Sequence, residues 1–216
     1  MLQIFEKTFS LMIPPVCPVC KENVIDPSRE IVCQSCFRKL SLQFVDSGHI
    51  RWAGTVPVYF SMVYSDTVKR LIQLFKFENF ESIGRFLARV MMNKLEEEQV
   101  NFDYIVYIPS HPARIREKGS YPTKFLAREL SHLSGRPVLH ILKATRYRKS
   151  QTSARDRSAN VHGAFQVTGE YIPDVTLLIV DDVITTGSTM AEAGRVLREA
   201  GYEKLVGIAT AGKGKP

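Results

Sequence analysis

The chain has 216 residues, a formal net charge of +7 and 44% hydrophobic residues. This size and composition suit one medium-sized α/β domain with a small appendage. No apolar run approaches the roughly 20 residues that a membrane-spanning helix needs, which excludes such a helix within this sequence. The first 15 residues lack the charged segment and small-residue cleavage site of a secretory signal, so we expect a cytoplasmic protein.

The four cysteines all lie near the N-terminus, in two Cys-x2-Cys pairs separated by twelve residues: Cys17, Cys20, Cys33 and Cys36. Each pair can direct two thiolates at one ion, so together they predict a tetrahedral four-sulfur site. Thiolates favour zinc, with an iron–sulfur cluster as a metal-bound alternative and two disulfides as a metal-free one. Four thiolates leave no open coordination position, so we expect a structural Zn²⁺ that stabilises a segment with little core of its own.

After the cysteines, the sequence predicts a connection and then a strand. Residues 37–55 contain two glycine turn signals and are expected to form the connection. The only tryptophan, Trp52, is expected to serve packing. The run 56–64 is rich in β-branched and aromatic residues but contains Pro57, which favours an edge strand.

The middle of the chain alternates helical and strand patterns. Apolar residues at i, i+3, i+4 and i+7 predict amphipathic helices over 66–77, 86–95 and 122–133. Short apolar runs predict buried strands over 104–108 and 138–142. We expect the helical stripes to form core rather than to line a ligand site.

A loop with hydroxyl, imidazole and cationic side chains follows the strand over 104–108; these residues are Ser110, His111, Arg114, Arg116 and Lys118. The three cations suit an anionic ligand. His111 is equally suited to contacting a phosphate and to holding a structural hydrogen bond.

Positive charge is concentrated between Ser110 and Asn160, where twelve Lys/Arg face three Asp/Glu. This segment has a net charge of +9 and the rest of the chain −2. Such a face indicates an anionic partner, either pyrophosphate or nucleic acid, with an ordinary solvated surface as the alternative. Within it, 145–160 is polar and without periodicity, which predicts a functional loop that closes over a ligand. A short strand is expected over 163–167.

Two carboxylates and a hydroxyl-rich loop follow the apolar run 175–180, which predicts a strand buried on both faces. After Asp181 and Asp182, a helical pattern extends from Met190 to a stop at Gly201. A final strand is expected over 205–209. Strand, acid pair, loop and helix are typical of an α/β ligand site at the carboxyl end of a strand.

The loop 185–189 offers backbone N–H groups and hydroxyls at a helix N-terminus, where an anion is favoured. Gly187 permits close backbone approach, and a Walker loop is excluded because no lysine precedes the Ser/Thr. The two carboxylates suit sugar hydroxyls, with a divalent cation offsetting their charge. A phosphate beside a diol describes a ribose 5-phosphate. The alternative is that Asp182 or Ser188 merely caps the helix.

The thirteen residues from Leu177 to Thr189 resemble the phosphoribosyl pyrophosphate (PRPP) signature of type I phosphoribosyltransferases. The paired cysteines ahead of this signature, Gln151, and the segment from Arg157 to Phe165 narrow the resemblance to the ComF family, associated with DNA uptake in competent bacteria. The resemblance implies an α/β fold, with a parallel twisted sheet flanked by helices, a hood and a small zinc-binding knuckle. We expect the knuckle in residues 1–50 and the phosphoribosyltransferase domain in 51–216.

The resemblance also implies roles for individual residues. The 5-phosphate of PRPP would be held by Thr185, Thr186, Gly187, Ser188 and Thr189. Pyrophosphate, bridged by Mg²⁺, would be met by Ser110, His111, Arg114, Arg116 and Lys118. Arg155 or Arg157 would close over the diphosphate, and the expected catalytic residues are Asp181, Asp182 and Arg157. The chain departs from the family pattern at Ser120-Tyr121-Pro122, where Phe-Asn-Gln is usual, which puts acceptor chemistry in doubt.

Three functions remain open at this stage. The first is a phosphoribosyltransferase that binds PRPP or ribose 5-phosphate and transfers phosphoribosyl to an unidentified acceptor. The second is a competence protein that uses the basic face and the zinc knuckle to bind single-stranded DNA beside the DNA-uptake machinery. The third is a PRPP-responsive regulator. Turnover of PRPP with a base separates the first from the second.

Overall fold

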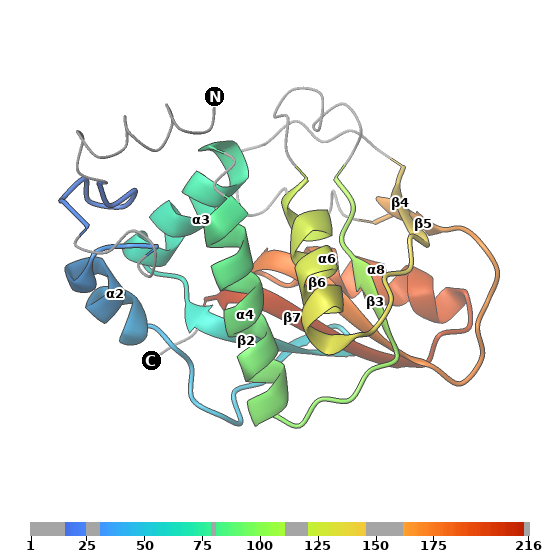
Figure 1. Ribbon diagram of the computed structural model, residues 1–216. Helices are drawn as coiled ribbons and strands as arrows, with labels where there is room; N and C mark the ends of the chain where they lie inside the picture. The colour runs from blue at the N-terminus through green and yellow to red at the C-terminus, as the bar shows by residue number, and fades with distance from the viewer. Residues whose placement is uncertain (1–15, 25–30, 79–80, 111–120, 146–161, 214–216) are drawn as a thin grey trace.

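A five-stranded sheet in the order β1-β2-β7-β6-β3 forms the centre of the molecule (Figure 1). The computed structural model describes residues 16–24, 31–78, 81–110, 121–145 and 162–213. Neighbouring strands run parallel except for β1, which pairs antiparallel with β2. The strands are β1 (Arg51–Ala53), β2 (Val56–Val63), β3 (Tyr104–Tyr107), β6 (Thr176–Ile184) and β7 (Lys204–Gly212).

Helices cover both faces of the sheet, as Figure 1 shows. One face carries α3 (Asp66–Glu78), α4 (Glu81–Glu97) and α6 (Pro122–Ser134), and the other carries α8 (Ser188–Glu199). Along β6, Leu178 and Val180 join the core on the three-helix side, whereas Leu177 and Ile179 join the core on the α8 side. This alternation confirms the predicted strand that is buried on both faces.

The predicted connection over 37–55 is wrong at both of its ends. Its start belongs to helix α2 (Gln34–Ser41), whose N-cap Cys33 accepts a hydrogen bond from the Cys36 backbone N–H. Only Cys36 and Leu40 are buried along this helix, so it lacks the apolar stripe by which helices are recognised in a sequence. At the other end, the three residues of β1 form a hairpin with β2.

Because of this hairpin, β2 is not the edge strand that Pro57 indicates. Ala53 and Val56 close the hairpin, which places Pro57 opposite Trp52 in the next pair, where hydrogen bonding is not required. The register with β7 starts at Val58, one residue after the proline. Trp52 itself is 65% exposed, so the expectation that it serves packing is also wrong.

Residues 138–142 do not form the single strand expected. Val138 makes an isolated parallel bridge to Ile105, and the next regular strand is β4 (Leu142–Ala144), which pairs antiparallel with β5 (Phe165–Val167). This two-stranded ribbon is separate from the main sheet and matches the expected hood. Leu142 and Phe165 pack in the core on the α8 side, so the ribbon is attached to the helix that follows the signature loop.

A glycine determines how closely α8 packs on the sheet. A Cβ at Gly194 would lie 2.3 Å from Val56 Cγ2, so the glycine lets α8 lie close against β2.

The longest described helix, α4, has 17 residues. Within the described ranges, none of the helices has the combined length and apolarity that crossing a bilayer requires.

Candidate functional site

The acid pair lies within the last residues of β6, rather than in the loop after it. Asp181 pairs with Ala209 of β7 in the strand register, and Asp182 follows it. The Asp182 backbone N–H donates to Asp181 Oδ1 at 2.8 Å. Asp182 Oδ2 lies 2.6 Å from the Nζ of Lys76, at the end of α3. Both aspartates are half-buried, so each is in part accessible to solvent.

The loop between the acid pair and α8 is short and depends on one glycine. Gly187 is the N-cap of α8 and has φ +81°, a conformation that favours glycine. A Cβ there would lie 3.2 Å from Ala53 Cβ, so the loop also lies close against β1. The Thr186 and Ser188 hydroxyls are 2.7 Å apart. The N-cap position is therefore occupied by Gly187, and no side chain caps α8. The alternative in which Asp182 or Ser188 merely caps the helix is wrong.

This geometry suits an anion. The first N–H groups of an α-helix have no partner within the helix, and the helix dipole places partial positive charge at the same end. Thr185, Ser188 and Thr189 are half-buried and Thr186 is exposed, so the hydroxyls stand around this helix end. The arrangement provides donors for a phosphate within a few residues of two acceptor carboxylates.

Ser110 lies at the same sheet edge as the acid pair. Tyr107 pairs with Val180, and the Ile108 N–H donates to the Val180 carbonyl at 2.9 Å, so the chain leaves β3 beside the end of β6. Ser110 is half-buried. The structure therefore gathers Ser110, the acid pair and the loop 185–189. The remaining predicted residues, His111, Arg114, Arg116, Lys118, Arg155 and Arg157, lie outside the described residues.

Tyr121 and Pro122, two of the residues that depart from the family pattern, form the start of α6. Pro122 occupies the first turn, where a missing N–H carries no penalty. The Tyr121 ring packs edge-on against Tyr107 at 5.6 Å. Burial, the neighbouring Tyr107 and its hydroxyl raise the pKa of Tyr121 to about 12, and a hydrogen bond from the Ser110 backbone opposes that rise. Tyr107 also hydrogen-bonds His140 at 3.1 Å.

The four cysteine sulfurs form one cluster, with all ligand atoms within 4.8 Å of one another. The Cys20 and Cys33 sulfurs are 3.4 Å apart. Tetrahedral zinc with Zn–S bonds of about 2.3 Å requires sulfur separations of about 3.8 Å, so the cluster fits zinc. A disulfide needs about 2.05 Å, and all four cysteines are free, which rules out the disulfide alternative in this conformation.

Ionisation of the cluster is uneven. Burial opposes ionisation of Cys17, but backbone hydrogen bonds from Cys20 and Cys33 lower its pKa to about 7. Burial and the neighbouring thiols raise the pKa of Cys36 well above its ordinary value. Zinc binds thiolates and therefore displaces the protons of any neutral thiols in the cluster.

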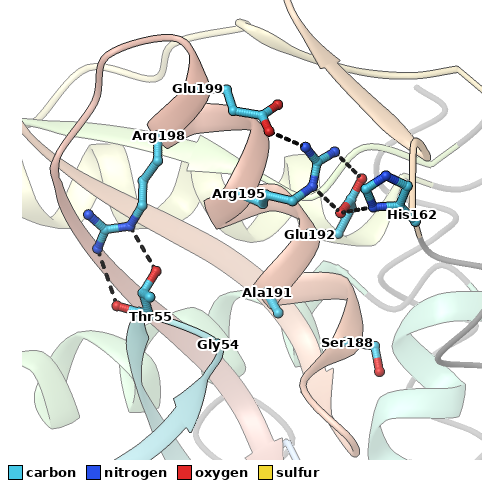
Figure 2. Close-up of a pocket in the computed structure, with 9 residues that line it drawn as sticks. All are labelled: Gly54, Thr55, His162, Ser188, Ala191, Glu192, Arg195, Arg198 and Glu199. Carbon is cyan, nitrogen blue, oxygen red and sulfur yellow. Dashed lines mark hydrogen bonds and ion pairs between the residues drawn. The ribbon is translucent and has the colours of Figure 1, made fainter.

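A cavity of about 560 Å³ lies along the outer face of α8 (Figure 2). It shares Ser188 with the signature loop and is lined by Gly54, Thr55, His162, Ser188, Ala191, Glu192, Arg195, Arg198 and Glu199. Its charged groups make hydrogen bonds and ion pairs within the protein. Arg195 donates to Glu192 and Glu199, and Arg198 donates to Thr55. These hydrogen bonds therefore connect α8 to its neighbours in the fold.

Glu192 is the centre of this network and is only 6% exposed. It accepts the Gly163 N–H at 2.6 Å as well as two bonds from Arg195. Hydrogen bonds from Arg195 lower the pKa of Glu192, burial opposes them, and the Gly163 N–H adds to the lowering. Thr145 donates to the Gly163 and Ala164 carbonyls. The ribbon is thereby tied to the helix that begins at the phosphate loop.

Lys76 is the residue of the site that the sequence did not single out. The helical pattern places Lys76 on an amphipathic helix, but its contact is with a residue more than 100 positions further along the chain. The available signal was a lysine between Phe75 and Phe77, in the last turn of an otherwise apolar stripe.

A mostly parallel sheet, with an acid pair and a hydroxyl loop at its carboxyl edge, defines a domain of the phosphoribosyltransferase class. Consistent with this class, the sequence model of the phosphoribosyl transferase domain matches residues 114–214. Competence protein F of Haemophilus influenzae is 32% identical over 152 residues, which cover 66% of this chain and 66% of that protein, just under two thirds of its length. The DNA utilization protein YhgH of Salmonella typhimurium is 28% identical over 195 residues, covering 86% and 79%. The chain therefore carries a match to the phosphoribosyl transferase domain and is similar to proteins named for competence and DNA utilization.

Solved structures show weaker likeness. Orotate phosphoribosyltransferase from Aeropyrum pernix has a TM-score of 0.38 at 19% identity, covering 80% of this chain and 73% of that one. Adenine phosphoribosyltransferase from Saccharomyces cerevisiae has a TM-score of 0.38 at 18% identity, covering 81% and 88%. These scores add nothing to the fold assignment, which rests on the strand order and the domain match.

Replacing the buried Cys36 by serine tests the metal site. We expect the purified chain to contain one zinc per molecule and Cys36→Ser to lose it. Thermal unfolding should then begin about 10 °C lower, because metal-binding free energy contributes to folding. Elemental analysis and calorimetry measure both effects, and Ser35→Ala on the same helix is the control. Wild-type protein without zinc, or a variant with unchanged zinc and stability, would contradict the assignment.

Glu192→Gln tests the α8 network. The lowered pKa means that the carboxylate stabilises the fold above its ordinary pKa of 4.5, and that this stabilisation is lost as the pH falls through the lower native value. At pH 7 we expect a loss of about 1–3 kcal/mol. The difference from wild type should narrow below about pH 4.5. Glu199→Gln, at a 62% exposed side chain, should change stability by less than about 0.5 kcal/mol. Equal losses for the two variants in pH-dependent chemical denaturation would refute this role.

Proposed function

We propose that this protein binds PRPP with Mg²⁺ and transfers the phosphoribosyl group to an acceptor. The observation that carries the proposal is the placement of Asp181 and Asp182 at the end of β6, directly before the hydroxyl loop at the N-terminus of α8. Two acceptor carboxylates beside a phosphate-binding helix end match a ribose 5-phosphate, with its diol on one side and its phosphate on the other.

In this proposal each group has a distinct task. The loop 185–189 and the first turn of α8 hold the 5-phosphate, and the two aspartates accept hydrogen bonds from the ribose hydroxyls. Mg²⁺, when bound, neutralises the pyrophosphate leaving group. The bond from ribose C1 to pyrophosphate breaks as positive charge develops on the sugar, and the acceptor then bonds to C1. The fixed carboxylates stabilise that developing charge.

Neutralising the acid pair tests this function. We expect isothermal titration calorimetry to show micromolar, Mg²⁺-dependent binding of PRPP to the wild-type protein. The double variant Asp181→Asn, Asp182→Asn should bind about 100-fold more weakly or worse, because each carboxylate makes charge-assisted hydrogen bonds. Ribose 5-phosphate serves as the ligand control, and circular dichroism checks the fold. Unchanged PRPP affinity in the double variant would sink the proposal.

A second candidate function, binding of single-stranded DNA in DNA uptake, is favoured by two observations. The names of two relatives refer to competence and to DNA utilization. The segment from Ser110 to Asn160 has a net charge of +9, and three of its cations that the structure describes are exposed on α6, after it and on β4: Arg128, Arg136 and Lys143. Such cations attract phosphates without regard to sequence. This function is compatible with PRPP binding on the same chain.

Fluorescence anisotropy with a labelled oligonucleotide tests the DNA proposal. Affinity for single-stranded DNA should fall steeply between 50 and 200 mM salt, since each released counterion contributes to the slope. Changing Arg128, Arg136 and Lys143 to glutamine should lower that slope by about two. Arg85→Gln, an exposed arginine outside this segment, should leave it unchanged. If the wild-type protein does not bind single-stranded DNA at 50 mM salt, the DNA-binding function is excluded. If it binds but the triple variant has an unchanged salt slope, these three cations do not contact the DNA.

A further inference from the structure

Lys76 extends from the last turn of α3 to the signature carboxylate. Its Nζ lies 2.6 Å from Asp182 Oδ2, and the two side chains are 21% and 18% exposed. Phe75, the preceding residue, is buried in the core, so the helix is fixed in place at this point. The contact therefore joins a firmly packed helix to the end of β6, and it is more sheltered than an ordinary surface ion pair.

The acid pair presents an electrostatic problem that this contact addresses. Two adjacent carboxylates stand a few residues before a loop suited to phosphate, and PRPP itself is highly anionic. Like charges at this spacing oppose the approach of an anionic ligand. The Asp182 N–H partly stabilises Asp181, but Asp182 needs a cation. Lys76 supplies one from within the protein.

We propose that Lys76 is a positioning residue of the ribose site, which acts through Asp182 and contributes charge that Mg²⁺ would otherwise have to supply. The ammonium occupies one side of Oδ2. An ionised carboxylate has about four acceptor positions, so Oδ1 and the rest of Oδ2 stay available for ribose hydroxyls. The proposal rests on the proposed binding of PRPP at this site.

A purely structural ion pair is the competing explanation. A cation in the last turn of a helix interacts favourably with the helix dipole, and Lys76 stands in the last turn of α3. In that case loss of Lys76 would change stability and would not change how ligand binding depends on Mg²⁺. The two explanations thus differ in a property that can be measured directly.

PRPP binding to Lys76→Met across a Mg²⁺ titration provides the test. Without the Lys76 ammonium beside Asp182, more of the neutralising charge must come from Mg²⁺, so the Mg²⁺ concentration for half-maximal PRPP affinity should rise about tenfold. At saturating Mg²⁺ the affinities of variant and wild type should converge. Lys76→Arg, which keeps the charge, should follow wild type. Lys69→Met, an exposed lysine on the same helix, is the matched control and should also follow wild type.

A second comparison asks whether Lys76 acts through Asp182. In an Asp182→Asn background, Lys76→Met should cause no further loss of PRPP affinity, since the group it positions is gone. Mg²⁺ curves of Lys76→Met that superimpose on wild type would refute the proposal. A loss that persists at saturating Mg²⁺, or that remains undiminished in the Asp182→Asn background, would equally refute it. Absence of PRPP binding by wild-type protein at every Mg²⁺ concentration would instead overturn the proposed function, and this inference with it.

Discussion

The parallel pairing of β6 with β3 and β7 is the constraint on which the site depends. Parallel strands end at the same edge of a sheet, so side chains far apart in the sequence meet there. The Ile108 N–H still bonds to the Val180 carbonyl, and Asp181 still pairs with Ala209, so the order of the sheet extends up to the acid pair. The carboxylates therefore stand on a rigid strand, whereas the loop 185–189 and Ser110 lie just beyond it.

The cysteine cluster is connected to the same site through packing. Cys17, Cys33 and Leu40 belong to one continuous buried core with Leu71 and Phe75 of α3. The position of α3 determines where Lys76 stands, and Lys76 contacts Asp182. A metal that orders the cysteine segment would thus also support the helix that carries the counter-cation of the acid pair. The cysteine segment can therefore affect the position of Lys76 without contacting a ligand, because both pack in the same core.

Local signals in the sequence are sufficient for the strands β3, β6 and β7, the main helices and the signature loop. The strand buried on both faces, the cysteine cluster and the helix over 122–133 all follow from short patterns, and the structure has them. What was missed depends on contacts that no short pattern contains. Helix α2 has two buried residues and no apolar stripe. Trp52 lies on a three-residue strand that is defined by its pairing in a hairpin. The role of Lys76 depends on its contact with Asp182. The sequence also ends the strand before the acid pair, whereas β6 continues through it, because polar residues in a central strand contradict the usual pattern.

The departure from the family pattern at Tyr121 and Pro122 is best understood from the packing of α6. Pro122 fixes the first turn of the helix, and the Tyr121 ring fills the space against Tyr107. The hydrogen bond between the Ser110 backbone and the Tyr121 hydroxyl then holds the point at which the chain leaves β3. The ring and the hydroxyl of Tyr121 are thus both held by other residues of the protein, Tyr107 and Ser110. Tyr121 and Pro122 therefore fix the start of α6 against the end of β3, which is a structural role for the two residues that differ from the expected pattern.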